Sequence, residues 1–176
     1  REVGILGLGA LGMASARRLR PFGFALSGWG RTAKAEPGVT CYHGKDSLSE
    51  FLSSSEVLIC LLPLTSGTRG ILNAATFQQM PVGAYLINCA RGPLVVEADL
   101  LAALDSGQLS GAALDVFDVE PLPQDNPLWT HPKVRITPHV SSLTAAETAA
   151  PLLATQIRQV QRGEPLDGCV DADVEY

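Results

Sequence analysis

The sequence predicts an α/β fold in which a doubly wound parallel sheet carries helices on both faces. Short apolar runs alternate with segments whose apolar residues recur at helical spacing, which is typical of strands alternating with helices. Two runs, 57–62 and 84–89, are almost wholly apolar, as expected of central parallel strands buried on both faces. A composition of 46% hydrophobic and 18% charged residues over 176 positions suits one domain with a substantial core.

Four apolar runs in the first half of the chain are predicted to be strands, at residues 3–6, 24–29, 39–42 and 57–62. A helical segment from Leu11 to Phe22 follows the first of them, because its apolar residues have helical spacing. A second helix is expected over 48–52, with Asp46 or Ser47 as its N-cap, since short oxygen-bearing side chains accept bonds from the N–H groups of a helix start. Pro63 ends the fourth strand because it has no N–H to donate to the sheet.

Three further runs are predicted to be strands, at residues 84–89, 111–117 and 134–137. Helical turns are expected over 68–80, with Thr76 as a candidate cap. A helix over 97–106 should bury Leu100, Leu101 and Leu104 and stop at Gly107, a residue that often ends helices.

The last predicted helix, 145–162, is amphipathic and precedes an acidic, irregular tail. Pro151 lies inside it and predicts a kink or a late start, because proline lacks the N–H that a helix interior needs. The apolar inner face of this helix consists of Leu152, Leu153, Ile157 and Val160.

The turn Gly7-x-Gly9-x-x-Gly12 between the first strand and helix indicates a Rossmann-type nucleotide site. Gly7 permits the turn, Gly9 leaves room for a pyrophosphate, and Gly12 lets the helix approach the strand. The helix start, with Ala10 and Leu11, offers free N–H groups and a dipole that attract phosphates. A glycine turn that closes a hairpin is the alternative, and the flanking strand and helix favour the nucleotide site.

The second strand lacks the acidic residue that would bind the 2′-hydroxyl of an adenine ribose. Gly30, Arg31, Thr32 and Lys34 stand in its place. A guanidinium binds a phosphate through two hydrogen bonds, and the missing carboxylate removes a repulsion. The segment therefore predicts NADP in preference to NAD, with NAD(H) use left open; a solvated loop with two cations is the alternative.

Loops at the carboxyl ends of parallel strands form the ligand crevice of such a sheet. Leu62 and Pro63 are expected to line the cofactor there, unless they only end the strand. Three polar residues follow three different strands and are expected to meet in this crevice, namely Arg91, Glu120 and His139. An arginine in this place can bind an anion, although a surface ion pair or a solvated carboxylate would explain such residues equally well.

The remaining features exclude several function classes. A net charge of −5 argues against a nucleic-acid surface, and no apolar run approaches the ~20 residues of a membrane helix. The four cysteines form no C-x-x-C pair, so we expect no metal and no disulfide, and a cytoplasmic protein. Cys60 and Cys89 lie in apolar runs, where cysteine acts as a small hydrophobe. His43 and His131 lie in polar loops and are interpreted as structural or exposed.

Four ordered motifs resemble the D-isomer-specific 2-hydroxyacid dehydrogenases. They are Gly7-x-Gly9-x-x-Gly12, Asn88-Cys89-Ala90-Arg91-Gly92, Ala113-Leu114-Asp115-Val116-Phe117-x-x-Glu120-Pro121 and Thr137-Pro138-His139. Within this family the chain is most similar to the glyoxylate and hydroxypyruvate reductases, through residues 28–32, 94–97 and the end of the tail.

The resemblance implies an NADP(H)-preferring oxidoreductase that reduces a small 2-oxo acid. It implies that Arg91 binds the carboxylate and carbonyl oxygen, that His139 is the general acid, and that Glu120 hydrogen-bonds His139. It also implies that the nicotinamide carboxamide is contacted by Cys89, Ala90 and Asp115, and by Ser141 and Ser142, which stand where the family often has glycine.

The division of the chain follows from the same resemblance. Residues 1–142 are expected to form the dinucleotide-binding domain, and 143–176 a C-terminal helix and tail that return toward a second, substrate-binding domain. The chain does not begin with Met and a strand starts almost at once, so we expect a fragment that lacks most of that domain and is inactive alone. The family also implies a homodimer formed through the coenzyme domain. The alternative function is a nucleotide-sensing, corepressor-like module on the same fold.

Overall fold

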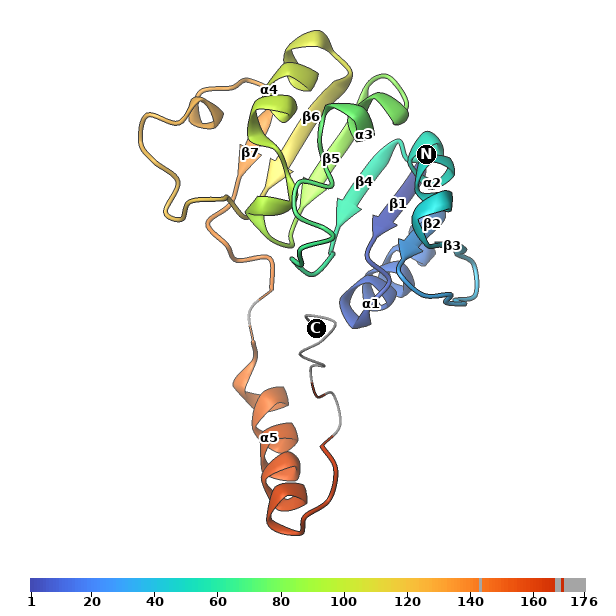
Figure 1. Cartoon of the computed structure of the whole chain (residues 1–176), viewed down its shortest axis with the longest axis vertical. Coiled ribbons are helices and arrows are strands. Elements are labelled where there is room, and N and C mark those ends of the chain that lie inside the picture. Colours follow the sequence, from blue (N-terminus) through green and yellow to red (C-terminus); the bar gives the residue numbers. More distant parts are fainter. Residues whose placement is uncertain (143, 167–168, 170–176) are drawn as a thin grey trace. The chain divides into compact units, whose positions relative to one another are not determined.

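The computed structural model describes residues 1–142, 144–166 and 169, and the chain divides into two units, 1–139 and 140–176. The first unit contains one seven-stranded sheet in which every neighbouring pair is parallel. The strand order β3-β2-β1-β4-β5-β6-β7 winds outward from the middle in both directions, which confirms the predicted doubly wound fold (Figure 1). The strands are β1 (Glu2–Leu6), β2 (Ala25–Gly30), β3 (Thr40–His43), β4 (Val57–Cys60), β5 (Ala84–Asn88), β6 (Leu109–Leu114) and β7 (Val134–Ile136).

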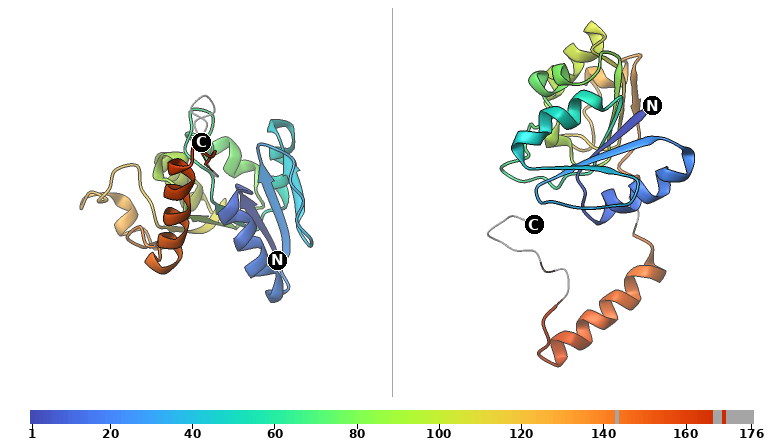
Figure 2. Two further views of the ribbon diagram at one scale, coloured as in Figure 1. Left: turned by 90° about the horizontal axis from the view of Figure 1, so that it is seen from below. Right: turned by 90° about the vertical axis from the view of Figure 1, so that its right-hand side faces the viewer.

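Helices cover both faces of the sheet (Figure 2). On one face α2, α3 and α4 pack side by side, and α1 packs on the other face against β1. The division follows from the alternation of side chains along a strand, since Ile5 packs with Ala16 of α1 whereas Leu6 joins the larger cluster that contains Phe51 of α2. The helices of this unit are α1 (Ala10–Leu19), α2 (Leu48–Ser54), α3 (Ala74–Gln79) and α4 (Glu97–Ser106), with short 3-10 turns η1 (Arg20–Phe22), η2 (Lys45–Ser47), η3 (Gly92–Leu94) and η4 (Pro127–Trp129).

The central strands are buried more completely on one face than on the other. In β4, Leu58 and Cys60 are buried, whereas Val57 and Ile59 are only half-buried. The prediction of burial on both faces is therefore only partly right, because a single helix of the first unit, α1, covers the second face, and it lies over β1.

Several predicted element ends and caps were wrong. β4 ends at Cys60 rather than Leu62, and β6 begins at Leu109 and ends at Leu114. Asn73 is the cap of α3: its side chain accepts from the N–H of Thr76, and the Thr76 hydroxyl accepts from the N–H of Asn73. Ser47 precedes α2 without capping it, because its hydroxyl donates to the carbonyl of His43 instead.

The α4 region agrees more closely with its prediction. The helix spans the predicted residues, and Gly107 ends it with a left-handed φ of 82°. Leu100 and Leu104 are fully buried, and Leu101 is half-buried at the edge of the same cluster.

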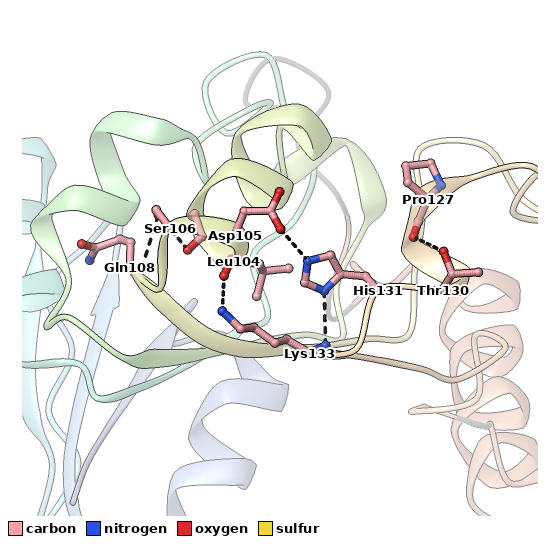
Figure 3. A network of polar contacts seen from close by, with 9 residues as sticks. Leu104, Asp105, Ser106, Gln108, Pro127, Thr130, His131 and Lys133 are labelled. Carbon is pink, nitrogen blue, oxygen red and sulfur yellow. Dashed lines mark hydrogen bonds and ion pairs between the residues drawn. The ribbon is translucent and has the colours of Figure 1, made fainter.

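His131 has a structural role at the amino edge of β7 (Figure 3). Its Nδ1 accepts from the backbone N–H of Lys133 at 3.2 Å, so the ring proton lies on Nε2, which faces Asp105 of α4 at 3.3 Å. The Lys133 ammonium donates to the carbonyl of Leu104 in the same helix. These bonds join the end of α4 to the start of β7, as the structural interpretation of His131 predicts.

The second unit contains α5 (Ala146–Gln161). Pro151 lies well inside this helix, so the predicted late start was wrong. The predicted inner face is exposed: Leu152, Leu153, Ile157 and Val160 retain 56–60% of their accessible surface. No residue of α5 is buried by the described part of the chain. Most of the end of the tail, which carried part of the closer resemblance, lies outside the described residues.

None of the helices in the described part of the chain combines the length and hydrophobicity that a bilayer crossing requires.

The close approach of α1 to β1 gives a stability prediction. An added Cβ at Gly12 would lie 1.9 Å from the carbonyl oxygen of Gly7, so Gly12→Ala should lower the free energy of unfolding by about 1–3 kcal/mol. Gly9→Ala is the matched control, because a Cβ there meets nothing within 4 Å and its φ of −76° suits alanine; it should change stability by less than ~1 kcal/mol. Urea denaturation measures both variants, and equal losses would contradict the close-approach account.

Candidate functional site

One row of paired residues crosses the sheet near its carboxyl edge. From one side to the other it consists of Tyr42, Trp29, Leu6, Cys60, Asn88, Leu114 and Ile136. Almost every residue that the sequence singled out stands just beyond this row. Arg91 and His139 each lie three residues further along the chain than Asn88 and Ile136, as Phe117 does relative to Leu114.

The glycine turn is held against the neighbouring strand ends. The N–H groups of Gly7 and Leu8 donate to the carbonyl of Trp29 at 2.8 and 3.2 Å. Gly7 has φ 116°, and a Cβ there would lie 2.7 Å from the carbonyl carbon of Leu61. Glycine is therefore required at this position both for its conformation and for the close backbone contact.

The start of α1 leaves backbone donors available. The first intrahelical bond runs from the N–H of Met13 to the carbonyl of Gly9 at 3.0 Å, and no side chain caps the helix. The N–H groups of Ala10, Leu11 and Gly12 precede that bond and have no partner within the helix. Gly9, Ala10 and Leu11 are exposed, and the space beside Gly9 is open. A pyrophosphate fits this arrangement.

The segment after β2 presents basic and polar side chains at the same edge. Gly30 is buried beside Leu8 of the glycine turn. Arg31, Thr32 and Lys34 follow it and are all exposed. Positive charge thus lies just beyond the end of β2, the strand next to β1, where the ribose end of a dinucleotide would extend.

A threonine pair that the sequence analysis did not single out fixes the loop after β4. The Thr68 hydroxyl donates to the carbonyl of Pro63 at 2.7 Å and accepts from the N–H of Thr65 at 2.8 Å. Leu62 is buried and Pro63 is half-buried. The predicted cofactor-lining pair therefore sits on a fixed loop; the i, i+3 spacing of the two threonines is the sequence signal that could have indicated it.

Asn88 fixes the turn that presents Arg91, and sequence reasoning missed this role as well. Its side chain is 1% exposed, accepts from the N–H of Ala90 and donates to the carbonyl of Arg91, both at 3.1 Å. Arg91 is exposed to solvent. Its Nη1 donates a hydrogen bond to the carbonyl of Ala90 at 2.6 Å. Cys89 is half-buried within this turn.

Gly92 brings the Arg91 turn directly against the segment that leads to Glu120. A Cβ on Gly92 would lie 1.8 Å from the carbonyl carbon of Phe117 and 2.3 Å from the nitrogen of Asp118. Only glycine allows these two backbones to approach so closely.

Glu120 and His139 form a direct pair. Nδ1 of His139 lies 2.8 Å from Oε2 of Glu120, and Oε1 of Glu120 accepts from the N–H of Phe117 at 2.9 Å. The bond with His139, followed by the bond from Phe117, lowers the pKa of the Glu120 carboxyl. A carboxylate accepts only, so Nδ1 carries a proton, and Nε2 is left as the ring atom that can exchange a proton with a ligand.

Backbone bonds connect this pair to the Arg91 turn. The N–H of His139 donates to the carbonyl of Asp115 at 2.9 Å, and the N–H of Asp115 donates to the carbonyl of Asn88 at 3.0 Å. His139 adopts φ 54°, a left-handed conformation that is uncommon outside glycine and often marks functional positions. Asp115 is buried and accepts a hydrogen bond from the Thr137 hydroxyl.

The structure thus brings Glu120 and His139 into contact and places Arg91 on the same edge, with its guanidinium bonded, among the described residues, to the carbonyl of Ala90 in its own turn. Ser141 and Ser142 are exposed and belong to the second unit. His43 is exposed. Burial raises the pKa of the Cys60 thiol to about 12, which agrees with a small hydrophobe. Among the described residues, no group of three His, Cys, Asp or Glu side chains could hold a metal ion.

Comparison with known proteins gives consistent results. A family model described as "D-isomer specific 2-hydroxyacid dehydrogenase, NAD binding domain" matches residues 1–141. A glyoxylate/hydroxypyruvate reductase A from Salmonella newport is 51% identical over 170 residues, which cover 97% of this chain and 54% of the relative. The chain therefore spans about half the length of the curated relatives that it matches.

Comparison with solved structures identifies the same family. A D-isomer specific 2-hydroxyacid dehydrogenase from Xanthobacter autotrophicus, in complex with NADPH and MES, superposes with a TM-score of 0.97 at 49% identity, covering 99% of this chain and 72% of that one. An NADPH-dependent glyoxylate/hydroxypyruvate reductase from Sinorhizobium meliloti, in complex with NADP and sulfate, gives 0.95 at 40% identity, covering 99% and 57%.

The lowered pKa of Glu120 predicts how stability depends on pH. Folding lowers this pKa, so the ionised carboxylate stabilises the fold above the ordinary glutamate pKa of roughly 4.3, and this contribution disappears as the pH falls through the folded value. The unmodified protein should therefore be more stable than Glu120→Gln at pH 6, and the gap should close on acidification. Urea denaturation between pH 3 and 6 measures the gap; a gap that widens in acid would contradict this assignment.

Proposed function

The chain belongs to the D-isomer specific 2-hydroxyacid dehydrogenase family, and from this premise we propose that it forms the coenzyme-binding and proton-transferring part of an NADPH-dependent reductase. The proposed substrate is a small 2-oxo acid such as glyoxylate or hydroxypyruvate, and the product is the 2-hydroxy acid. The observation that carries the proposal is the 2.8 Å contact between His139 and Glu120 at the carboxyl edge of the sheet, on the same edge as Arg91.

The glycine turn and the segment after β2 support the coenzyme assignment. The free N–H groups of Ala10, Leu11 and Gly12 suit the pyrophosphate, beside the open space at Gly9. Arg31, Thr32 and Lys34 would bind the 2′-phosphate that distinguishes NADPH from NADH, since guanidinium and ammonium groups both pair with phosphate. Complexes of the two relatives with NADPH and NADP agree with this choice, and NADH remains the weaker alternative.

When bound at the glycine turn, NADPH would supply the hydride that reduces the substrate carbonyl. Arg91 binds the substrate carboxylate and carbonyl oxygen, and its positive charge draws electron density toward that oxygen. His139 donates the proton on Nε2 to the same oxygen as negative charge develops there. Glu120 holds Nδ1 and stabilises the imidazolium before transfer. Oxidation reverses these steps, with His139 as the base.

The surrounding residues complete the proposal. Leu62 and Pro63 line the coenzyme, and Cys89, Ala90 and Asp115 contact its carboxamide. Ser141 and Ser142, which follow His139 in the sequence, are proposed for the same contact.

The proposed organisation is a coenzyme domain over 1–142, and a helix and tail over 143–176 that serve a substrate domain. A cytoplasmic homodimer that pairs through the coenzyme domain completes the proposal. The regulatory alternative gains no support, since the relatives compared above are named as reductases or dehydrogenases.

Proton transfer by His139 is tested with His139→Asn, because asparagine tolerates the left-handed φ of 54°. Turnover of glyoxylate by the full-length protein should fall by about 10²–10⁴-fold, the usual contribution of a general acid. The NADPH dissociation constant should stay nearly unchanged, because His139 is not proposed to bind the coenzyme. NADPH absorbance follows turnover and NADPH fluorescence follows binding; full activity in the variant would refute the assignment.

The phosphate role of Arg31 predicts a change in coenzyme preference. Arg31→Asp should weaken NADPH binding by roughly 10–100-fold, since it removes a charge-assisted contact and adds a repulsion. NADH binding should hold or improve. Arg31→Lys is the control, because it keeps the positive charge but loses the planar guanidinium. Its NADPH affinity should lie between those of the unmodified protein and Arg31→Asp. A ratio of NADPH to NADH affinity that is equal in all three proteins would contradict the role of Arg31.

A further inference from the structure

The connection from β2 to β3 is unusual because it has no helix. β2 and β3 are parallel neighbours, so residues 31–39 must run back from the carboxyl edge of the sheet to its amino edge. Its first part, 31–35, is exposed throughout and carries Arg31, Thr32 and Lys34. The course of such an exposed segment depends in part on how its far end is held.

The far end is attached to the last part of α1 and to η1. Nε of Arg17 donates to both carboxylate oxygens of Glu36 at 3.1 Å, and Nη2 donates to Oε2 at 2.8 Å. Arg20 donates from Nη1 to the carbonyl of Pro37 at 2.9 Å. The N–H of Val39 then closes a turn on the carbonyl of Glu36 at 3.1 Å. The Glu36 side chain is only 7% exposed, although the segment before it is open to solvent.

We propose that the Arg17–Glu36 pair positions the β2–β3 connection for the coenzyme 2′-phosphate and thereby helps to set the preference for NADPH over NADH. This inference rests on the proposed function. Neither residue is proposed to touch the coenzyme; the pair acts through Arg31, Thr32 and Lys34. Two nitrogens of one guanidinium hold one carboxylate, which fixes orientation as well as distance.

The charges of the pair make this role distinguishable from a simple electrostatic one. Glu36 is the first acidic residue after Arg31, and the bonds from Arg17 lower the pKa of its carboxyl, so it is ionised at neutral pH. By charge alone, Glu36 would repel the 2′-phosphate and Arg17 would attract it. Removing Glu36 should then strengthen NADPH binding, and removing Arg17 should weaken it. If the pair acts by positioning, both removals weaken binding.

The test compares Glu36→Gln, Arg17→Gln and the double variant in the full chain. NADPH and NADH dissociation constants are measured by fluorescence at fixed ionic strength. Each single variant should weaken NADPH binding by about three- to tenfold. The reason is that Arg31 and its neighbours would no longer be held in place for the 2′-phosphate, so part of the energy of that charge-assisted contact is lost. The double variant should be no worse than either single one, since both remove the same contact. NADH binding should stay unchanged.

Arg18→Gln is the matched control. It removes the same charge from the same turn of α1, and Arg18 is exposed and does not pair with Glu36. It should alter NADPH affinity less than twofold. This result would distinguish the effect of the Arg17–Glu36 contact from the effect of removing one positive charge from α1. Thermal melts should show all variants folded, because the Arg17 side chain is 59% exposed and glutamine keeps polar atoms at each substituted position.

The outcomes separate the inference from the function that it rests on. Unchanged NADPH affinity in both single variants, or changes of opposite sign, would overturn the positioning role while leaving NADPH binding established. Equal losses of NADPH and NADH affinity would also overturn it. Failure of the unmodified full chain to bind NADPH would overturn the proposed function, and this inference with it.

Discussion

Backbone hydrogen bonds between β5, β6 and β7 keep Asn88, Leu114 and Ile136 level with one another, and the candidate site depends on this register. A slip of one residue would turn each following side chain to the other face of the sheet. In the observed register the Arg91 turn, the segment leading to Glu120, and His139 leave the sheet side by side. Asp115 then joins them, since its N–H and carbonyl bond to Asn88 and His139. The geometry of the Glu120–His139 pair is thus set mainly by the sheet.

Close backbone contacts at glycines, together with the strand register, fix the turns at the carboxyl edge of the sheet. Gly7 and Gly12 let the first turn pack against Leu61 and against itself, and Gly92 does the same for the Arg91 turn against Phe117. These glycines serve different turns by one physical means, the absence of a Cβ where two backbone segments meet. Gly9 differs, because the space beside it stays open. The same residue type therefore has a packing role at three positions and borders open space at the fourth.

Much of the fold could be predicted from the sequence, because its signals are local. Alternating apolar runs indicated the strands, and the Gly107 stop of α4 was confirmed. The cap of α3 and the roles of Asn88 and Thr68 were missed, since they depend on side-chain bonds within turns whose shape periodicity does not reveal. The exposed apolar face of α5 was mispredicted because an amphipathic pattern says which side is apolar and not what covers it. The places of Arg91, Glu120 and His139 after three strands predicted that they share one edge of the sheet, and the family resemblance implied the bond between Glu120 and His139. That this bond uses Nδ1 of His139 required the structure.

The central claim is that Arg91 and His139 act on one oxygen atom of a 2-oxo acid. The most direct measurement is a crystal structure of the full-length protein with NADPH and oxamate, an unreactive analogue of glyoxylate. We predict that the oxamate carbonyl oxygen lies within hydrogen-bond distance of both the Arg91 guanidinium and Nε2 of His139, with Glu120 still bonded to Nδ1. Oxamate bound at the carboxyl edge without His139, or with Nε2 of His139 turned away from it, would contradict the account.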